Sequence, residues 1–284
     1  MATASTEPTE SSDNTLPECL VFPARKEHTA TVIISHGLGD SAKNFAYFLN
    51  DLKDHPDLGH VKFILPSAPI MSVTGMRGRS IPSWFNIYSF NYVNRSEDEV
   101  GLFRSVGWLK QLITNEETQH SIPSNRIVIG GLSQGGAISI LTTLTIEKPL
   151  AGLFALSTYI PLRQKFPEAS IIHPIIYPCP TSNYGRNIPI LWCHGTGDQQ
   201  VICKDWKQLA KTLAGQLSIP FVTSDHPQEF PTEDRGTNSK DSDGASQDKA
   251  RLHFRSYEGM GHCTEESELL EVAGWIARRI PGEA

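Results

Sequence analysis

The sequence of 284 residues predicts an α/β fold in which a mostly parallel sheet is doubly wound and flanked by helices. One observation is a series of short, continuous apolar runs, each typical of a strand buried on both faces of a sheet. The other is that segments with apolar residues at three- and four-residue spacing lie between these runs, as in helices that cover a sheet. The alternation of the two patterns predicts repeated β–α units.

Five apolar runs are expected to form buried strands: 29–35, 62–65, 126–129, 152–156 and 188–193. Pro189 is expected at the start of its strand, because proline cannot donate a hydrogen bond to a neighbouring strand. Residues 252–257 alternate apolar and polar side chains. This alternation predicts a half-covered strand at the edge of the sheet.

Three segments place apolar side chains on one face of a helix. The first two carry Leu102, Val106, Leu109 and Ile113, and then Ala137, Leu141 and Leu144. The third, near the C-terminus, carries Leu269, Val272, Ala273, Ile276 and Ile280. In a doubly wound sheet the functional groups gather outside the carboxyl ends of the strands, so the site is expected along that edge.

One domain is predicted over residues 19–284, preceded by a tail over 1–18 and interrupted by an acidic insertion over 222–250. The tail is rich in Ser, Thr, Glu and Pro, and each of the two segments has a net charge of −4. Neither segment can bury enough apolar surface to offset the entropy cost of ordering, so both are expected to be disordered. The rest of the chain then has a charge of +2, against −6 for the whole sequence.

Composition argues against several classes of protein. The near-neutral remainder gives no electrostatic argument for nucleic-acid binding. The sequence has no secretory signal and no apolar run close to the roughly 18–20 residues that span a bilayer. Its five cysteines are widely spaced and form no CxxC pair, which argues against a disulfide scaffold and a zinc site. We therefore expect a reduced cytoplasmic protein.

Residues 131–135 read Gly-Leu-Ser-Gln-Gly and match the motif G-x-S-x-G. A predicted strand ends just before the motif and a helix rich in small residues begins just after it, as a nucleophile elbow requires. Such a turn holds its serine in a strained backbone conformation and needs glycine on both sides. Ser133 is therefore predicted to be a nucleophile, with an incidental serine in a glycine-rich turn as the alternative.

A serine hydroxyl is a weak nucleophile without a base, and five histidines follow Ser133. His262 is favoured because it lies in a loop between the last strand and the last helix, where α/β hydrolases place the base. Of the other four, His253 lies in the middle of a predicted strand and His226 lies in the insertion. His173 lies among prolines and isoleucines, and His194 precedes an aspartate.

Asp198 lies on a glycine-rich loop after the 188–193 strand and completes the order nucleophile, acid, base. Its predicted role is to hold the imidazole tautomer and to stabilise the imidazolium, although loop aspartates also commonly form turns. A zinc site at His194, His262 and Asp198 is a further alternative. It is disfavoured because no single element carries ligands at the spacing of a zinc site.

Acyl transfer also needs donors for a developing oxyanion. One predicted donor is the backbone N–H of Gln134, directly after the nucleophile. The second is the N–H of Leu38, in the loop that follows the 29–35 strand. His36 in the same loop is interpreted as a residue that packs and shapes the loop.

Together these stretches resemble the acyl-protein thioesterases of the lysophospholipase/carboxylesterase type, which are α/β hydrolases, over residues 16–280. The resemblance rests on stretches in one order: 36–40, 66–69, 82–85, 122–127, 130–136, 155–162, 194–198 and 257–262. Transferred position by position, it implies Ser133 as nucleophile, Asp198 as acid and His262 as base. Leu38 and Gln134 would be the oxyanion donors.

The resemblance implies hydrolysis of S-palmitoyl or similar thioesters on proteins, without a metal or cofactor. The implied partners are S-acylated proteins, with transient contact at the membrane surface. The implied location is the cytoplasm, with the nucleus as a second compartment. Five apolar side chains in the 66–85 region are candidates to line an acyl channel: Ile70, Met71, Met76, Ile81 and Trp84.

Departures from the family pattern lie outside the three predicted catalytic residues. Asn86 stands where the family usually has Asp, Thr158 and Tyr159 stand where it has Cys-Trp, residues 199–201 differ, and the insertion is additional. Two alternative functions remain open. A carboxylesterase or lysophospholipase would use the same triad on oxygen esters. A non-catalytic binding protein is disfavoured, because such proteins typically lack a triad member.

Overall fold

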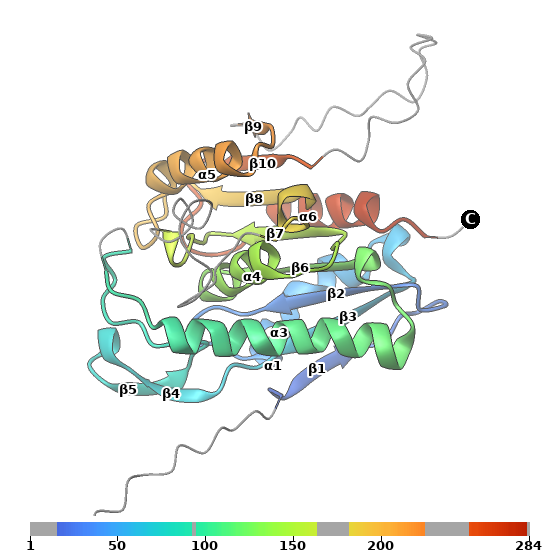
Figure 1. Ribbon diagram of the computed structural model, residues 1–284, viewed down its shortest axis with the longest axis horizontal. Helices are drawn as coiled ribbons and strands as arrows, with labels where there is room; N and C mark the ends of the chain where they lie inside the picture. The colour runs from blue at the N-terminus through green and yellow to red at the C-terminus, as the bar shows by residue number, and fades with distance from the viewer. Residues whose placement is uncertain (1–15, 93–94, 164–181, 225–249, 283–284) are drawn as a thin grey trace, which may run out of the picture.

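The computed structural model describes residues 16–92, 95–163, 182–224 and 250–282. Its main sheet has the strand order β1-β3-β2-β6-β7-β8-β10-β9 (Figure 1). All neighbouring strands are parallel except β1, which is antiparallel to β3. The strands are β1 (Cys19–Phe22), β2 (Ala30–Ser35), β3 (Val61–Pro66), β6 (Ile127–Leu132), β7 (Gly152–Leu156), β8 (Ile190–Gly195), β9 (Phe221–Ser224) and β10 (Leu252–Tyr257).

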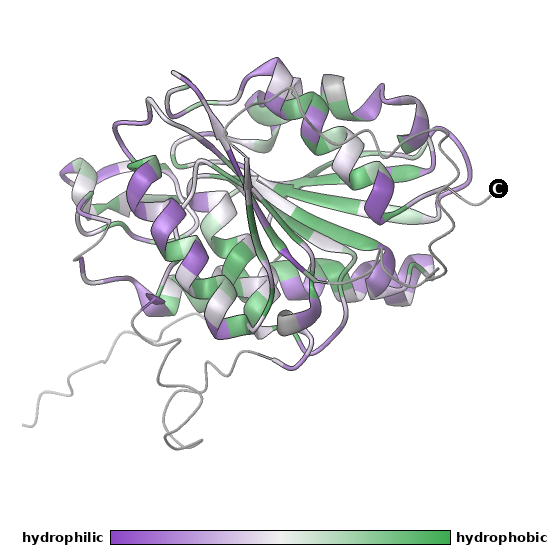
Figure 2. Cartoon of the chain, turned by 90° about the horizontal axis from the view of Figure 1, so that it is seen from above, coloured by the Kyte–Doolittle hydropathy of each residue, from purple (hydrophilic) through white to green (hydrophobic). Residues whose placement is uncertain are grey.

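Helices cover both faces of this sheet, as predicted for a doubly wound α/β fold. One face packs against α3 (Glu99–His120), α4 (Gln134–Thr145) and α5 (Cys203–Leu217). The other packs against α1 (Ala42–Phe45), α2 (Leu49–Lys53) and α6 (Glu266–Arg279). Figure 2 shows the apolar strands between the two layers, with the polar side of each helix turned outward. Of the described helices, none is both long and apolar enough to cross a membrane.

The five predicted core strands are present, and their side chains are almost all buried. Pro189 directly precedes β8, and its carbonyl accepts a hydrogen bond from the Leu153 N–H at 2.9 Å. Both sides of the sheet therefore bury apolar side chains, in two separate clusters.

The prediction of β10 as an edge strand is wrong, because β10 pairs on both sides, with β8 and with β9. The edge is β9, which includes residues 222–224 that were assigned to the insertion. Most of the insertion, residues 225–249, and most of the N-terminal tail, residues 1–15, lie outside the described residues.

The order of the strands places one crevice at the centre of the sheet. From β2 the chain moves outward to β3, and it then returns to the other side of β2 with β6. The loops after β2 and β6 therefore lead in opposite directions from neighbouring strand ends. In open α/β sheets such a switch point is where ligands bind. The predicted oxyanion loop follows β2 and Ser133 follows β6.

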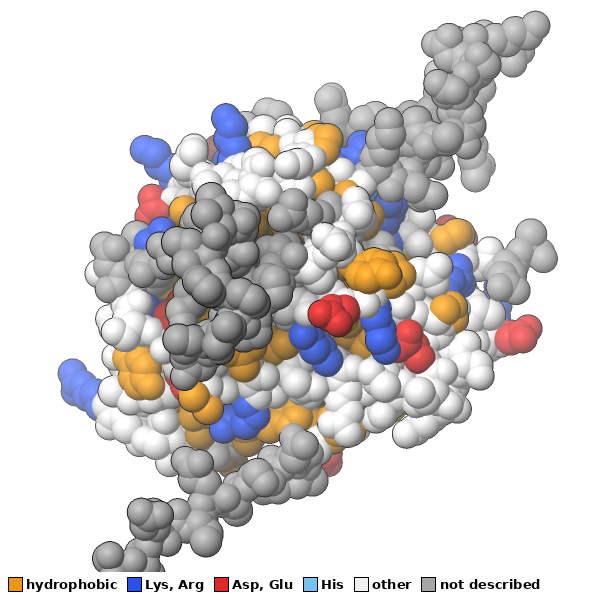
Figure 3. Space-filling model, viewed as in Figure 1, with side chains coloured by type: hydrophobic (Ala, Val, Ile, Leu, Met, Phe, Trp, Pro, Cys, Tyr) orange, Lys and Arg blue, Asp and Glu red, His pale blue; other side chains and the backbone are white. Residues whose placement is uncertain are grey.

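A separate hairpin lies beside this edge of the sheet. It consists of β4 (Ile70–Val73) and β5 (Arg79–Pro82), which pair antiparallel (Figure 1). The Gly39 N–H donates to the Pro82 carbonyl at 2.8 Å, which ties the hairpin to the loop after β2. On the molecular face shown in Figure 3, Lys and Arg side chains lie among Asp and Glu side chains and small apolar areas.

Candidate active site

Ser133 lies in the tight turn between β6 and α4 with φ of 52° and ψ of −116°. A positive φ is rare for a residue with a Cβ and stores strain of about 1–3 kcal/mol. The Ser133 backbone is held on both sides, because its N–H donates to the Leu156 carbonyl at 2.9 Å and its carbonyl accepts from the Thr158 hydroxyl at 2.6 Å. The backbone of the predicted nucleophile elbow is therefore fixed.

The flanking glycines are required by close approach of neighbouring backbone. A Cβ on Gly135 would lie 2.1 Å from the Ser35 carbonyl oxygen, and a Cβ on Gly131 would lie 2.4 Å from the same atom. Both separations are far below van der Waals contact, so the end of β2 can pass next to the elbow only because these positions lack side chains.

The structure brings the three predicted catalytic residues together from three separate strand ends. The Ser133 hydroxyl is 2.9 Å from His262 Nε2, and His262 Nδ1 is 2.7 Å from Asp198 Oδ2. Ser133 and Asp198 are buried, whereas the His262 side chain is 14% exposed. Both separations are within hydrogen-bond range, so a proton can pass from the hydroxyl to an imidazole whose other nitrogen faces a carboxylate.

The Asp198 carboxylate receives donors on both oxygens. Oδ1 accepts from the N–H groups of Gln200 and Val201 at 2.8 and 2.9 Å, while Oδ2 faces His262 and, at 3.2 Å, His194 Nε2. Burial alone would raise the pKa of the Asp198 carboxyl. The hydrogen bonds from His194, His262 and Val201 outweigh burial and hold this pKa well below its usual range, so the group is an anion at neutral pH.

The loop after β2 lies directly against the elbow. A Cβ on Gly37 would be 3.6 Å from Ser133 Cβ. Among the described residues, the hydrogen bonds include none donated by the backbone N–H of Leu38 or Gln134. These are the two N–H groups that the sequence predicts as oxyanion donors. The Gln134 N–H also belongs to the first residue of α4, where the helix dipole favours negative charge.

His36 shapes this loop, in agreement with its interpretation from the sequence. Its Nε2 accepts from the Ala68 N–H at 3.0 Å, so the proton lies on Nδ1, which donates to the Gly37 carbonyl at 2.7 Å. Burial lowers the pKa of His36 and keeps the ring neutral. The His36 carbonyl accepts from the Trp84 indole N–H at 2.8 Å.

The Gln134 side chain joins the elbow to the segment 83–85, a contact that the sequence did not suggest. Its Oε1 accepts from the Trp84 N–H at 3.0 Å. Its Nε2 donates to the Phe85 carbonyl at 2.8 Å and to the Ser83 hydroxyl at 3.0 Å. Since all of these groups are buried, this amide fixes the start of α4 against the segment that follows the β4–β5 hairpin.

The five predicted acyl-channel residues fall into three groups. The prediction that Trp84 lines the channel is corrected, because this side chain is completely buried in the core and its indole N–H donates to the His36 carbonyl. Ile70, the first residue of β4, is 74% exposed. Met71, Met76 and Ile81 are partly buried and pack against the core. Ile81 lies near the loop, since a Cβ on Gly39 would be 3.8 Å from Ile81 Cδ1.

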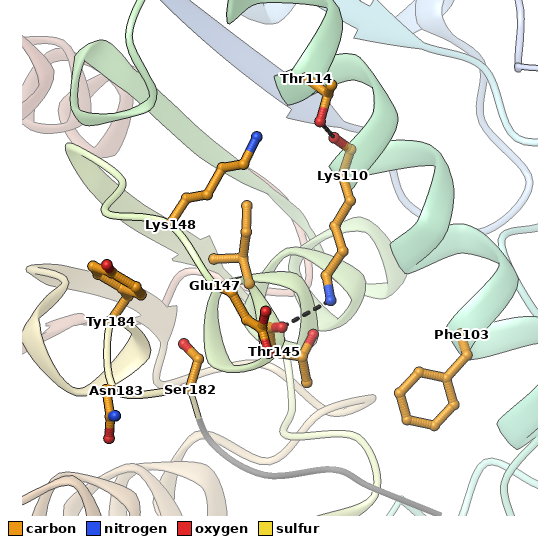
Figure 4. A pocket seen from close by; sticks show the side chains of 10 residues that line it. Phe103, Lys110, Thr114, Thr145, Glu147, Lys148, Ser182, Asn183 and Tyr184 are labelled. Carbon is orange, nitrogen blue, oxygen red and sulfur yellow. Dashed lines mark hydrogen bonds between the residues drawn. The ribbon is translucent and has the colours of Figure 1, made fainter.

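A hollow lies at the far end of α4 from Ser133, between α3 and residues 182–184 (Figure 4). Its lining includes Lys110, whose ammonium group donates to the Thr145 carbonyl at 2.8 Å and so caps the C-terminus of α4. This contact stabilises a helix end. The side chains that line the hollow include no serine–histidine pair in the described residues, in contrast to the elbow.

Comparisons with known proteins identify relatives of this chain. The family model described as Phospholipase/Carboxylesterase matches residues 17–218. The chain is 35% identical over 262 residues to acyl-protein thioesterase 1 of Mycosarcoma maydis, covering 90% of this chain and 93% of that protein. It is 42% identical over 192 residues to acyl-protein thioesterase 1 of Schizosaccharomyces pombe, covering 68% and 79%.

Solved structures have the same fold. A variant of SOBER1 from Arabidopsis thaliana matches with a TM-score of 0.68 and 25% identity, covering 88% of this chain and 100% of that chain. Acyl-protein thioesterase 2 from Zea mays matches with a TM-score of 0.67 and 21% identity, covering 93% and 99%. At 21% identity, the likeness to the Zea mays protein shows a shared fold and nothing more.

Proposed function

Because the chain belongs to the phospholipase/carboxylesterase family of α/β hydrolases, we propose that it hydrolyses S-acyl thioesters on protein cysteines through an acyl-serine intermediate. The observation that carries the proposal is the hydrogen-bonded series from Ser133 through His262 to Asp198. The choice of a protein thioester as substrate is supported by relatives named acyl-protein thioesterase 1, which align with this chain over nearly its full length.

In the first half-reaction, His262 Nε2 takes the Ser133 proton while the serine oxygen attacks the acyl carbonyl carbon. The resulting oxyanion would lie between the backbone N–H groups of Leu38 and Gln134. When the intermediate collapses, the carbon–sulfur bond breaks, and the imidazolium can protonate the departing thiolate. Asp198 remains an anion and stabilises the imidazolium.

In the second half-reaction, His262 removes a proton from water, and the hydroxide attacks the acyl-serine. Collapse of this second intermediate releases the carboxylic acid, which ionises in solution, and His262 returns its proton to Ser133. We propose Met71, Met76 and Ile81 as the apolar side chains near the acyl group. Ile81 lies beside the loop after β2, Met71 pairs with Ile81 across the hairpin, and Met76 lies in the connection between β4 and β5.

Substrates carried on a lipid-modified protein imply transient contact with a membrane surface. An acyl chain gains about 0.8 kcal/mol for each CH₂ that it buries in the bilayer, so its withdrawal needs an apolar receiving surface. The partly buried side chains of the β4–β5 hairpin are the proposed surface. Residence in the cytoplasm and nucleus is proposed from the resemblance of the chain to acyl-protein thioesterases.

A comparison of two substrates with one acyl chain tests the function. One substrate is a peptide that carries S-palmitoyl-cysteine, and the other is a lysophospholipid with a palmitoyl ester. We expect a higher kcat/KM for the thioester, with both activities lost in Ser133→Ala. Equal or better turnover of the lysophospholipid, again lost in Ser133→Ala, would support the second candidate, an oxygen-ester hydrolase, which the description of the family model favours.

A further inference from the structure

His194 is a second histidine at the predicted catalytic acid. It is the next-to-last residue of β8 and is completely buried. Its Nε2 is 3.2 Å from Asp198 Oδ2, the same oxygen that lies 2.7 Å from His262 Nδ1. The Asp198 carboxylate oxygen therefore lies between two imidazole rings, only one of which reaches Ser133.

The neighbours of the His194 ring determine where its proton lies. Nε2 is 2.7 Å from the Val201 carbonyl oxygen, which can only accept, so Nε2 carries the proton. Nδ1 is 3.4 Å from the Trp192 indole N–H, which can only donate. The ring also lies nearly parallel to Phe254, with a ring-centre separation of 6.3 Å and an angle of 12°. One tautomer and one orientation satisfy all of these contacts.

We propose that His194 is a positioning residue that acts through Asp198. Its single Nε2–H faces the Val201 carbonyl at 2.7 Å and also approaches Oδ2 at 3.2 Å, while the N–H groups of Gln200 and Val201 donate to Oδ1. The carboxylate then has a single orientation, in which Oδ2 faces His262 Nδ1. This inference rests on the proposed function, because it assigns a supporting role at the same catalytic residues.

The position of His194 in the chain explains why it can do this. It comes four residues before Asp198, and its Nε2 also contacts the carbonyl of Val201, three residues after Asp198. It therefore holds both the loop that carries the acid and the acid itself. A role in the loop alone predicts a change in stability, whereas a role at the carboxylate also predicts changes in kcat and in the pH profile.

The test compares three substitutions of His194 with a matched control. His194→Gln places an amide N–H near the position of Nε2. His194→Asn keeps a polar side chain that is too short to reach Asp198, and His194→Leu removes the donor. The control is His253→Gln, on the neighbouring strand β10, where the half-buried histidine has no contact with the catalytic residues that the structure describes.

We expect His194→Asn and His194→Leu to lower kcat at least about tenfold, the low end of what loss of an outer hydrogen-bond partner costs at metal sites. KM for a short-chain thioester should change little. With one donor removed, the carboxylate no longer holds Oδ2 against His262 Nδ1 and stabilises the imidazolium less, so the acidic limb of kcat/KM should move to lower pH. His194→Gln should recover most of the kcat and the wild-type limb, and the control should match wild type.

Thermal unfolding of each variant separates this role from a purely structural one. If His194→Leu does not fold, His194→Asn decides the result. Wild-type kcat and an unmoved acidic limb in a folded Asn or Leu variant would overturn the proposal. So would equal losses in the Gln, Asn and Leu variants with no movement of the limb, because ring packing would then be what matters. Activity that survives in Ser133→Ala would instead overturn the proposed function itself.

Discussion

At the residue scale, the Ser133 elbow depends on the two glycines Gly131 and Gly135, which have no side chain. Its positive φ and the passage of β2 within 2.1 Å of the Cβ position of Gly135 leave room only for hydrogen. The strain is local, but its relief would displace the hydroxyl from His262. Geometry of this kind makes two glycines as necessary as the serine that they flank.

We predict that Gly135→Ala abolishes activity and lowers the unfolding midpoint. The new methyl group would collide with the Ser35 carbonyl, which belongs to a central strand and cannot move away. The control is Gly107→Ala on the exposed side of α3, where a Cβ meets nothing within 4 Å. This control should gain up to about 1 kcal/mol in unfolding free energy, because alanine is the better helix former. A folded, active Gly135→Ala enzyme would contradict the account of the elbow.

The predicted catalytic residues illustrate what can be deduced from sequence at this scale. Ser133, Asp198 and His262 could be predicted because each follows a predicted strand and because their order is typical of one fold. The contacts of His194 could not, since a histidine beside a candidate acid has several possible roles until its ring orientation is known. Trp84 was misplaced for a related reason, because an apolar side chain near a site can equally be core.

At the element scale, α4 is attached to the rest of the site by one buried amide. The Gln134 side chain accepts from the Trp84 N–H and donates to the Phe85 carbonyl, and both residues are buried. The segment that follows β5 therefore keeps a fixed position relative to the elbow. The glutamine contributes a backbone N–H to the site and a side chain to its frame.

We predict that Gln134→Leu lowers the unfolding free energy by about 1–3 kcal/mol, because the buried Trp84 N–H loses its acceptor. The Phe85 carbonyl keeps the hydrogen bond from the Ser83 hydroxyl. The backbone N–H of residue 134 remains, so a fall in kcat would report the shifted 83–85 segment. Urea unfolding and thioester hydrolysis measure the two effects. Gln208→Leu on the exposed side of α5 is the control and should change neither. Unchanged stability in Gln134→Leu would contradict the proposed attachment.

α6 carries a glutamate, Glu268, whose carboxyl group is buried in the interior of the protein. Glu268 is completely buried beneath the sheet, and burial raises its pKa well above the ordinary value. Well below pH 4 the side chain is protonated in both the folded and unfolded states. As pH rises, the unfolded chain releases the proton while the folded protein retains it, so the contribution of Glu268 to stability falls with rising pH.

Glu268→Gln should therefore stabilise the protein at pH 8 and have a smaller effect at pH 4.5. Glutamine has nearly the shape of the protonated acid and cannot ionise. Unfolding free energies of wild type and variant at both pH values provide the measurement, and the difference between the two proteins cancels the titration of other groups. Glu266→Gln, exposed in the first turn of α6, should show no such gain. A gain that is equal at both pH values would rule out the ionisation of Glu268 as its cause.

The edge elements show why the fold could be predicted only in part. The central strands β2, β6, β7 and β8 form continuous apolar runs, which burial on two faces requires. The edge strands β1 and β9 each have four residues and are partly exposed, so they lack that pattern. β10 alternates like an edge strand, yet β9 covers it. The partner of an alternating strand depends on chain far away in the sequence.

At the scale of the whole molecule, the carboxyl ends and the amino ends of the strands have different roles. The predicted catalytic residues lie at the carboxyl ends of the strands. Near the amino ends, Glu116 of α3 is buried and accepts from Lys62 of β3 and from Thr31 of β2, each at 2.6 Å. This cluster joins a helix to two strands of the sheet. It is separated from Ser133 by nearly the full length of β2.

Stability and catalysis should therefore separate when this cluster is broken. We predict that Lys62→Met lowers the unfolding free energy by up to about 3–5 kcal/mol, because the buried Glu116 loses its lysine partner. His28 and His120 remain near its carboxylate, at 3.6 and 3.8 Å. The double variant Lys62→Met/Glu116→Gln should recover much of this loss, since it removes both charges. Below the unfolding temperature, kcat for the thioester should remain at the wild-type value in both variants. A fall in kcat without a loss of stability would show that the amino end of the sheet is coupled to the elbow, in conflict with the division of work between the two ends.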